Sequence, residues 1–177
     1  MALTACKITI LNVERNDIVL PLYTETNNQS QSNQKLFWIL PGSGGISSFE
    51  KYWADEALAR GYTIAWLDSL TPRGIYKLHH KGMTLSTFER ALDMKLALYT
   101  LFENLEFFPW LDPNDITMIG ASHGAALGIR LLTDRYKFDL TDKIKKVYAL
   151  YPGLHPFETD HLTTDGSKLE IHVGELD

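Results

Sequence analysis

The sequence is poor in cysteine and has no long hydrophobic run, and each absence excludes a class of protein. Cys6 is the only cysteine among 177 residues, so an internal disulfide framework and a multi-cysteine metal site are both excluded. Its apolar surroundings favour a packing role. No apolar run approaches the length of a membrane span, and residues 1–20 interleave charged with apolar side chains, unlike the core of a signal peptide. We therefore expect a soluble, cytoplasmic protein without a membrane partner.

Positive charge is also scarce. Lysine and arginine number 17 against 22 aspartates and glutamates, which gives a formal net charge of -5. A nucleic-acid partner is not expected, because such partners select a clustered basic surface. The six histidines show no short ligand spacing such as His-x-x-x-His, so no metal site is expected. Internal repeats and low-complexity segments are absent as well, and residues 1–177 are expected to form a single domain.

Apolar segments and turn-forming residues alternate along the chain. Two N-terminal segments with a short turn between them predict an antiparallel hairpin. The continuous apolar run 36–40 is typical of a parallel strand that is covered on both faces. The expected strands are 7–13, 17–23, 36–40, 63–67, 116–119, 146–151 and 169–173.

Three helices are expected between these strands, at 48–60, about 87–105 and 122–134. The second begins with a capping box, Ser86 and Glu89. Its apolar residues are spaced to fall along one face of the helix; they are Phe88, Leu92, Leu96, Tyr99 and Phe102. Strands that alternate with helices predict the α/β class, with a mainly parallel sheet, helices on both faces and the N-terminal antiparallel hairpin.

Residues 119–124 (IGASHG) contain a Gly-x-Ser-x-Gly motif between an expected strand and an expected helix. A sharp strand-to-helix turn that exposes the serine hydroxyl leaves no space for side chains at Gly120 and Gly124. The start of the helix would favour a developing oxyanion beside the hydroxyl. Ser122 is therefore a candidate nucleophile. The alternative is that Ser122 is only a helix N-cap on a glycine-rich turn.

Several segments together resemble the α/β-hydrolase fold and, more narrowly, the dienelactone hydrolase family. They are 37–45 (FWILPGSGG), 67–74 (LDSLTPRG), 89–93 (ERALD), 117–124 (TMIGASHG) and 171–177 (IHVGELD). The namesake enzymes use a cysteine nucleophile, where this chain has Ser122, as many esterase-like relatives do. The resemblance implies a serine hydrolase of small carboxylic esters or lactones that needs no cofactor.

The resemblance also implies roles for individual residues. The backbone N–H of Ser43, or that of Gly44, and the backbone N–H of His123 would form the oxyanion hole. The His123 side chain is not expected to be the general base. Asp177, in a turn after the last expected strand, matches the catalytic acid, with Glu175 as a weaker candidate. The alternatives are an ordinary strand-terminating loop at 41–45 and a frayed terminal residue at Asp177.

The family places its catalytic histidine after the acid, and this sequence stops at the acid. We expect the chain to be a piece of a longer protein, with the C-terminal strand, its helices and the histidine missing. A naturally shortened homologue with impaired chemistry is the alternative. His155 is the best substitute base or substrate contact, although a surface role is more usual for a loop histidine.

Arg73 is a further candidate for contact with substrate. Its guanidinium could grip a substrate carboxylate, and a structural duty is an equal alternative. Two other functions remain open for the whole chain: a non-catalytic binding module on a hydrolase fold, and acyl transfer to an acceptor other than water. The sequence does not determine the oligomeric state.

Overall fold

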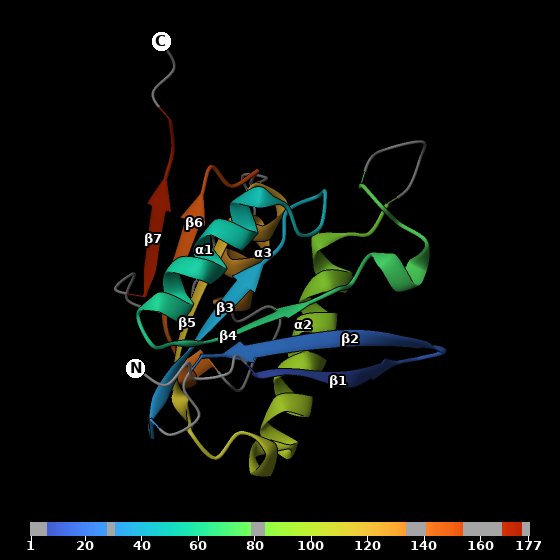
Figure 1. Cartoon of the computed structure of the whole chain (residues 1–177). Coiled ribbons are helices and arrows are strands. Elements are labelled where there is room, and N and C mark those ends of the chain that lie inside the picture. Colours follow the sequence, from blue (N-terminus) through green and yellow to red (C-terminus); the bar gives the residue numbers. More distant parts are fainter. Residues whose placement is uncertain (1–6, 28–30, 79–83, 134–140, 154–167, 175–177) are drawn as a thin grey trace.

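The protein is built on one seven-stranded sheet with the strand order β1-β2-β4-β3-β5-β6-β7 (Figure 1). The computed structural model describes residues 7–27, 31–78, 84–133, 141–153 and 168–174. Cys6, His155 and Asp177 lie outside these residues, as does Glu175. The roles predicted for them therefore stay predictions.

The sheet is mixed: its first strands pair antiparallel, and the other strands pair in parallel. The hairpin of β1 and β2 is antiparallel, and β2 also pairs antiparallel with β4. All remaining neighbours pair in parallel, so the predicted sheet and hairpin are confirmed. The strands are β1 (Lys7–Arg15), β2 (Ile18–Thr26), β3 (Gln34–Leu40), β4 (Thr63–Leu67), β5 (Leu111–Ala121), β6 (Ile144–Leu150) and β7 (Leu169–His172).

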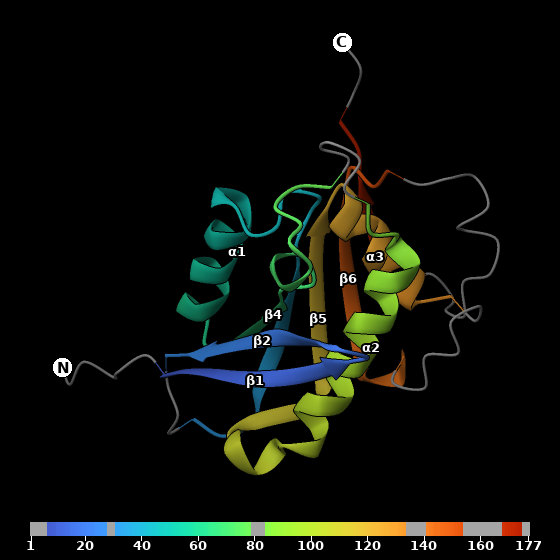
Figure 2. The ribbon, with the colours of Figure 1, turned by 90° about the vertical axis from the view of Figure 1, so that its right-hand side faces the viewer.

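Helices cover both faces of the sheet, as expected. Figure 2 shows the sheet nearly edge-on, with α1 (Ser48–Ala59) on one side and α2 (Thr87–Glu103) and α3 (His123–Leu131) on the other. Both α1 and α2 begin with a capping box, the second of which was predicted. Short 3-10 turns at Thr71–Arg73, Leu105–Phe107 and Thr141–Lys143 were not predicted. No described helix combines the length and the apolar character needed to cross a membrane.

Strand β3 runs through the middle of the core. Alternate residues Leu36, Trp38 and Leu40 pack on the side of α2 and α3, whereas Phe37 and Ile39 pack on the side of α1. All five are buried. A continuous apolar run is therefore the pattern that this doubly covered strand requires.

Strand β5 begins five residues earlier than predicted. Gln34 of β3 pairs with Leu111, and its N–H donates to the Trp110 carbonyl at 2.7 Å. The polar segment after Leu111 includes Pro113, which reads as a turn in the sequence. Leu111 joins the strand by pairing with Gln34, and residues 112–115 form the irregularity in register before the regular pairing resumes at Leu36 and Ile116.

The buried face of α2 coincides only in part with the predicted apolar stripe. Phe88 is 49% exposed, whereas Leu96 and Phe102 are partly buried and pack against the core. The fully buried face carries alanine, methionine and leucine residues together with two charged side chains; its members are Arg90, Ala91, Asp93, Met94, Ala97, Leu98 and Leu101. Charged residues at these positions hid the face from a search for apolar periodicity.

The Asp93 carboxylate, fully buried, joins three segments that are distant in sequence. Arg15, at the end of β1, donates from Nε to Oδ1 at 3.0 Å. Arg73 approaches from the 3-10 turn after β4, with Nη1 2.9 Å from Oδ2 and Nη2 3.0 Å from Oδ1. The hairpin, this turn and α2 are thus held at one carboxylate.

Replacement of Asp93 by asparagine tests this junction. Asp93→Asn leaves two largely buried guanidinium groups without their counter-charge. We expect a loss of about 3 kcal/mol in the free energy of unfolding, at the low end for buried pairs because both arginines keep some access to water. Urea unfolding provides the measurement. Asp55→Asn, which breaks the exposed pair with Lys51, is the control and should change little; equal losses in the two variants would contradict the assignment.

Candidate active site

Ser122 occupies a strained turn between β5 and α3. Its backbone has φ 53° and ψ -117°, a region that costs a residue with a side chain on the order of 1–3 kcal/mol. Ser122 is exposed, and although it stands at the N-cap position its side chain makes no cap hydrogen bond. The N-cap alternative therefore does not account for the choice of serine here.

The two flanking glycines are required by close backbone contacts. A Cβ added to Gly120 would lie 2.5 Å from the Gly124 carbonyl carbon, and one added to Gly124 would lie 2.0 Å from the Leu40 carbonyl oxygen. Real Cβ atoms do not approach other atoms so closely. The prediction that no side chain fits at either position is confirmed.

Hydrogen bonds fix the turn to the neighbouring strand. The Ser122 N–H donates to the carbonyl of Leu150, the last residue of β6, at 3.0 Å. The Ser122 carbonyl accepts from the Ala126 N–H at 3.1 Å within the first turn of α3. The backbone at Ser122 is thus fully engaged, while its hydroxyl faces solvent.

The loop after β3 lies directly beside this turn. Leu40, the last residue of β3, pairs with Gly120 of β5, so the two chain segments leave the sheet side by side. The Leu78 N–H donates to the Ser43 carbonyl at 2.8 Å. Within the described part of the chain, the N–H groups of Ser43 and Gly44 have no hydrogen-bond partner.

Glu50 fixes the loop from the side of α1. This carboxylate is 4% exposed and closes the capping box of α1 by accepting from the Ser47 N–H. Its Oε1 also accepts from the Gly42 N–H at 3.2 Å. The sequence analysis missed this second contact, although the spacing of Ser47 and Glu50 announces the capping box.

His123 is the first residue of α3, so its backbone N–H lies at the positive end of the helix dipole. Its ring nitrogen Nδ1 lies 2.7 Å from Nη1 of Arg90. A guanidinium only donates hydrogen bonds, so Nδ1 is the acceptor and the ring proton belongs on Nε2. The Nδ1 lone pair is therefore occupied by this contact.

Arg90 is the second residue that the sequence analysis missed. It is 2% exposed, and its Nη2 donates to the Pro41 carbonyl at 2.6 Å. Burial lowers the pKa of Arg90 to about 10, against the opposing charges of Asp93, Asp68 and Glu50, so the group remains a cation at neutral pH. The sequence feature that could have identified Arg90 is its place in segment 89–93, on the face of α2 that is buried in the structure.

The remaining predicted site residues fall in three groups. Arg73 grips the carboxylate of Asp93 and donates to the Ser69 carbonyl at 2.6 Å, which is the structural duty that the sequence left open. Gly44 is exposed beside the loop after β3. His155 and Asp177 lie outside the described residues, so their relation to Ser122 is not given by the structure.

A cavity of about 360 Å³ lies between the loop after β3 and the loop after β4. Tyr23 and Trp66 form part of its wall and stack with ring centroids 5.2 Å apart. Gly44 and Arg90 also line it. The loop that carries the candidate oxyanion donors therefore forms part of the cavity wall.

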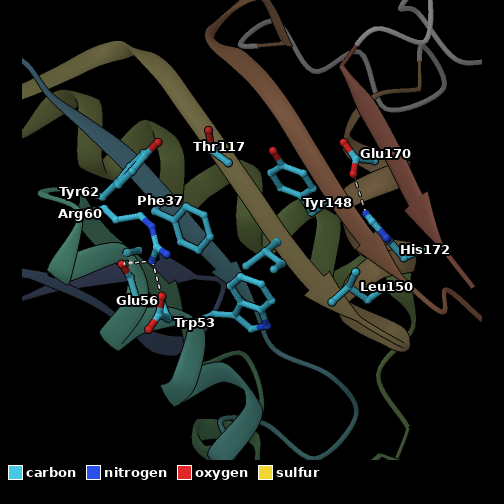
Figure 3. A pocket seen from close by; sticks show the side chains of 12 residues that line it. Phe37, Trp53, Glu56, Arg60, Tyr62, Thr117, Tyr148, Leu150, Glu170 and His172 are labelled. Atoms are coloured by element: carbon cyan, nitrogen blue, oxygen red, sulfur yellow. Dashed lines mark hydrogen bonds and ion pairs between the residues drawn. The ribbon is translucent and has the colours of Figure 1, made fainter.

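A larger cavity of about 540 Å³ lies on the α1 side of the sheet (Figure 3). Aromatic rings of Phe37, Trp53 and Tyr148 line it, with His172 at its edge. His172 is 2.8 Å from the Glu170 carboxylate. The pKa of Glu170 is lowered mainly by its hydrogen bond from Lys146 and, to a smaller extent, by the one from His172. Ser122, Ser43 and His123 line neither this cavity nor the smaller one.

No group of three or more histidine, cysteine, aspartate or glutamate side chains that could hold a metal ion occurs in the described ranges.

No protein-family model and no curated protein matches the sequence. Similarity appears among solved structures. MGS-M1, an α/β hydrolase enzyme from a Medee basin deep-sea metagenome library, superposes with a TM-score of 0.63 at 22% identity, over 94% of this chain and 67% of that one. Brefeldin A esterase, a bacterial homologue of human hormone-sensitive lipase, gives 0.62 at 16% identity, over 83% and 40%. A fungal esterase from Rhizomucor miehei gives 0.64 at 17% identity, over 86% and 46%.

These similarities show that the chain has the α/β-hydrolase fold, which confirms the fold expected from the sequence. The chain spans from 40% to 67% of the length of these three proteins. The fold also explains the position of Ser122, because ligands of open α/β sheets bind outside the carboxyl ends of the strands.

Replacement of Gly124 by alanine tests the close contact between the turn and β3. The new Cβ would collide with the Leu40 carbonyl oxygen, and since a backbone atom cannot rotate away, α3 must shift. We expect a loss of about 1–3 kcal/mol in the free energy of unfolding, measured by thermal unfolding. Gly44→Ala is the matched control, because a Cβ there meets nothing within 4 Å. An unchanged Gly124→Ala protein would contradict the contact.

Proposed function

We propose that the protein is a serine hydrolase of small carboxylic esters or lactones, with Ser122 as its nucleophile. The observation that carries the proposal is the backbone of Ser122, held at positive φ by a turn that only glycine neighbours permit. Strain of this kind persists where the surrounding structure imposes it, and it concentrates at active sites. It presents the hydroxyl at the carboxyl end of β5, at the start of a helix.

In the proposed reaction the Ser122 hydroxyl attacks the carbonyl carbon and forms a tetrahedral oxyanion. The backbone N–H groups of Ser43 and His123 stabilise that oxygen. The serine proton passes to a histidine and then to the departing alcohol; water releases the acyl group by the reverse sequence. Nucleophile, acid and histidine follow one another along chains of this fold, so the proposal assigns the acid to Asp177 and the histidine to sequence after it.

Two further observations support ester chemistry. The three solved structures with the same fold are described as an α/β hydrolase and as esterases. Segments 67–74 and 171–177 resemble the dienelactone hydrolase family, which extends the proposed substrates to lactones. The cavity of about 360 Å³ beside Gly44 has a size typical of small-molecule sites, and its aromatic wall suits an apolar group of the substrate.

A fluorophosphonate probe tests the nucleophile. The protein, in the full length that its gene encodes, should be labelled at Ser122, and Ser122→Ala should abolish labelling, because the probe reacts only with an activated hydroxyl. Labelling is measured by in-gel fluorescence and located by mass spectrometry. Ser48→Ala, an exposed serine in α1, is the matched control and should label like wild type.

Each other outcome assigns a different function. Equal labelling of wild type and Ser122→Ala would remove Ser122 as the nucleophile. An unlabelled protein that still binds ester analogues would be a binding module. Labelled protein that transfers its acyl group to added alcohol or thiol in preference to water would be an acyltransferase.

Occupation of the cavity can be tested at Gly44, whose missing Cβ faces open space. Gly44→Phe should fill the cavity and raise KM for a bulky ester on the order of tenfold or more, since lost apolar contacts of this size are worth about 1–3 kcal/mol. Gly44→Ala should keep the KM of wild type. Steady-state kinetics with one short and one bulky ester provide the measurement, and an unchanged KM in Gly44→Phe would place the substrate elsewhere.

A further inference from the structure

Arg90 contacts both backbone segments that the proposed oxyanion hole requires. From α2, its Nη2 donates to the carbonyl of Pro41, two residues before Ser43, at 2.6 Å. A weaker contact at 3.5 Å reaches the Gly42 carbonyl. On its other side Nη1 lies 2.7 Å from the ring of His123, directly after the nucleophile. These partners are 49 and 33 residues from Arg90 in sequence.

We propose that Arg90 is the positioning residue of the oxyanion hole. One guanidinium fixes the loop that carries the Ser43 N–H relative to the helix start that carries the His123 N–H. The inference rests on the proposed function, which supplies the oxyanion. Arg90 also lines the cavity of about 360 Å³, but the role proposed here is exerted through the two segments that it holds and not through contact with the reacting atoms.

The chemistry of arginine suits this task. Its donors lie in a rigid planar fork, so Nη1 and Nη2 cannot move independently, and neither can the two segments that they hold. An oxyanion hole works by preorganisation, with donors placed where negative charge develops. Displacement of a positioning group by about 1 Å can cost on the order of 100-fold in rate.

The partners of Arg90 differ from those of the neighbouring arginines. Arg15 and Arg73 both pair with the Asp93 carboxylate. Arg90 forms no ion pair with any carboxylate of the described residues, and its buried Nε has no hydrogen-bond partner there. A buried cation with an unpaired donor is costly. Its two terminal amino groups instead contact the loop after β3 and the ring of His123. These are the two segments on which the proposed oxyanion hole depends.

Glu50 complements this contact from the opposite side of the loop. It accepts from the Gly42 N–H, while Arg90 approaches the carbonyls of Pro41 and Gly42. The peptide between Pro41 and Gly42 is thereby held at both its carbonyl and its N–H. The next peptide, which carries the Ser43 N–H, is contacted at the Gly42 carbonyl, so a rotation that turns the Ser43 N–H away from the hole would break this contact and strain the fixed peptide before it.

The first test measures the rate of fluorophosphonate labelling at Ser122. Arg90→Met keeps the length of the side chain and removes every donor, and we expect labelling about 10- to 100-fold slower. Arg90→Lys keeps the charge without the fork and should be slowed to a smaller extent. With an ester substrate, kcat should fall while KM stays within about twofold, because the oxyanion forms only in the transition state.

The second test reports on His123 without any chemistry at Ser122. In protein with nitrogen-15 in its histidines, measured at mildly alkaline pH, wild type should show His123 with its proton on Nε2 alone. In Arg90→Met both tautomers should be populated, because the guanidinium no longer claims Nδ1. Arg90→Lys, which retains a donor, should restore part of the single-tautomer signal.

Leu98→Ala is the control for stability alone, since Leu98 is fully buried on the same helix and contacts neither segment through a polar group. It should lower the unfolding temperature and leave the labelling rate unchanged. If Arg90→Met does not fold, Arg90→Lys carries both tests.

The outcomes separate this inference from the proposed function. An unlabelled wild type overturns the hydrolase and, with it, the catalytic part of the inference, while the histidine signal still decides whether Arg90 holds His123. A labelled wild type with equally fast Arg90→Met and Arg90→Lys variants overturns the positioning role and leaves the hydrolase intact. Equal slowing in Leu98→Ala would reduce the effect to stability.

Discussion

The candidate site depends on one steric constraint, the contact of Gly124 with the carbonyl of Leu40. A Cβ at Gly124 would lie 2.0 Å from that oxygen, so α3 begins against the very end of β3. The turn at Ser122 and the loop that begins at Pro41 are consequently neighbours because of backbone contacts alone. Backbone contact sets the distance between them, and it does so through atoms that cannot change rotamer.

Two buried charged side chains further fix the loop that this backbone contact places beside Ser122. Glu50 and Arg90 approach Gly42 from α1 and α2, which lie on opposite faces of the sheet. An acid holds the N–H and a base holds the carbonyl, so each group meets the partner that its charge favours. The two side chains do not form a direct ion pair with each other, and each contacts the loop instead. The loop is thus an element shared by the two helical layers.

Much of the architecture was predictable, because strands such as 63–67 and the motif around Ser122 carry strong local signals: continuous apolar runs, capping boxes and obligatory glycines. The buried face of α2 was not predictable from apolar periodicity, since Arg90 and Asp93 occupy it. Their burial depends on partners 20 to 78 residues away, such as Arg15, which no local pattern reveals. For the same reason the sequence analysis considered Arg73 as a contact for a substrate carboxylate, whereas in the structure Arg73 pairs with the carboxylate of Asp93.

Helix α2 carries two buried contacts one turn apart. Arg90 faces the turn at Ser122, and Asp93 holds Arg15 at the end of β1; β1 lies against α2 (Figures 1 and 2). The hairpin is therefore connected through α2 to the candidate site, although it lies far from Ser122 in sequence. Shortening or replacing the hairpin would remove one of the contacts that fix α2, and would thereby weaken the support of the loop and the turn that Arg90 contacts.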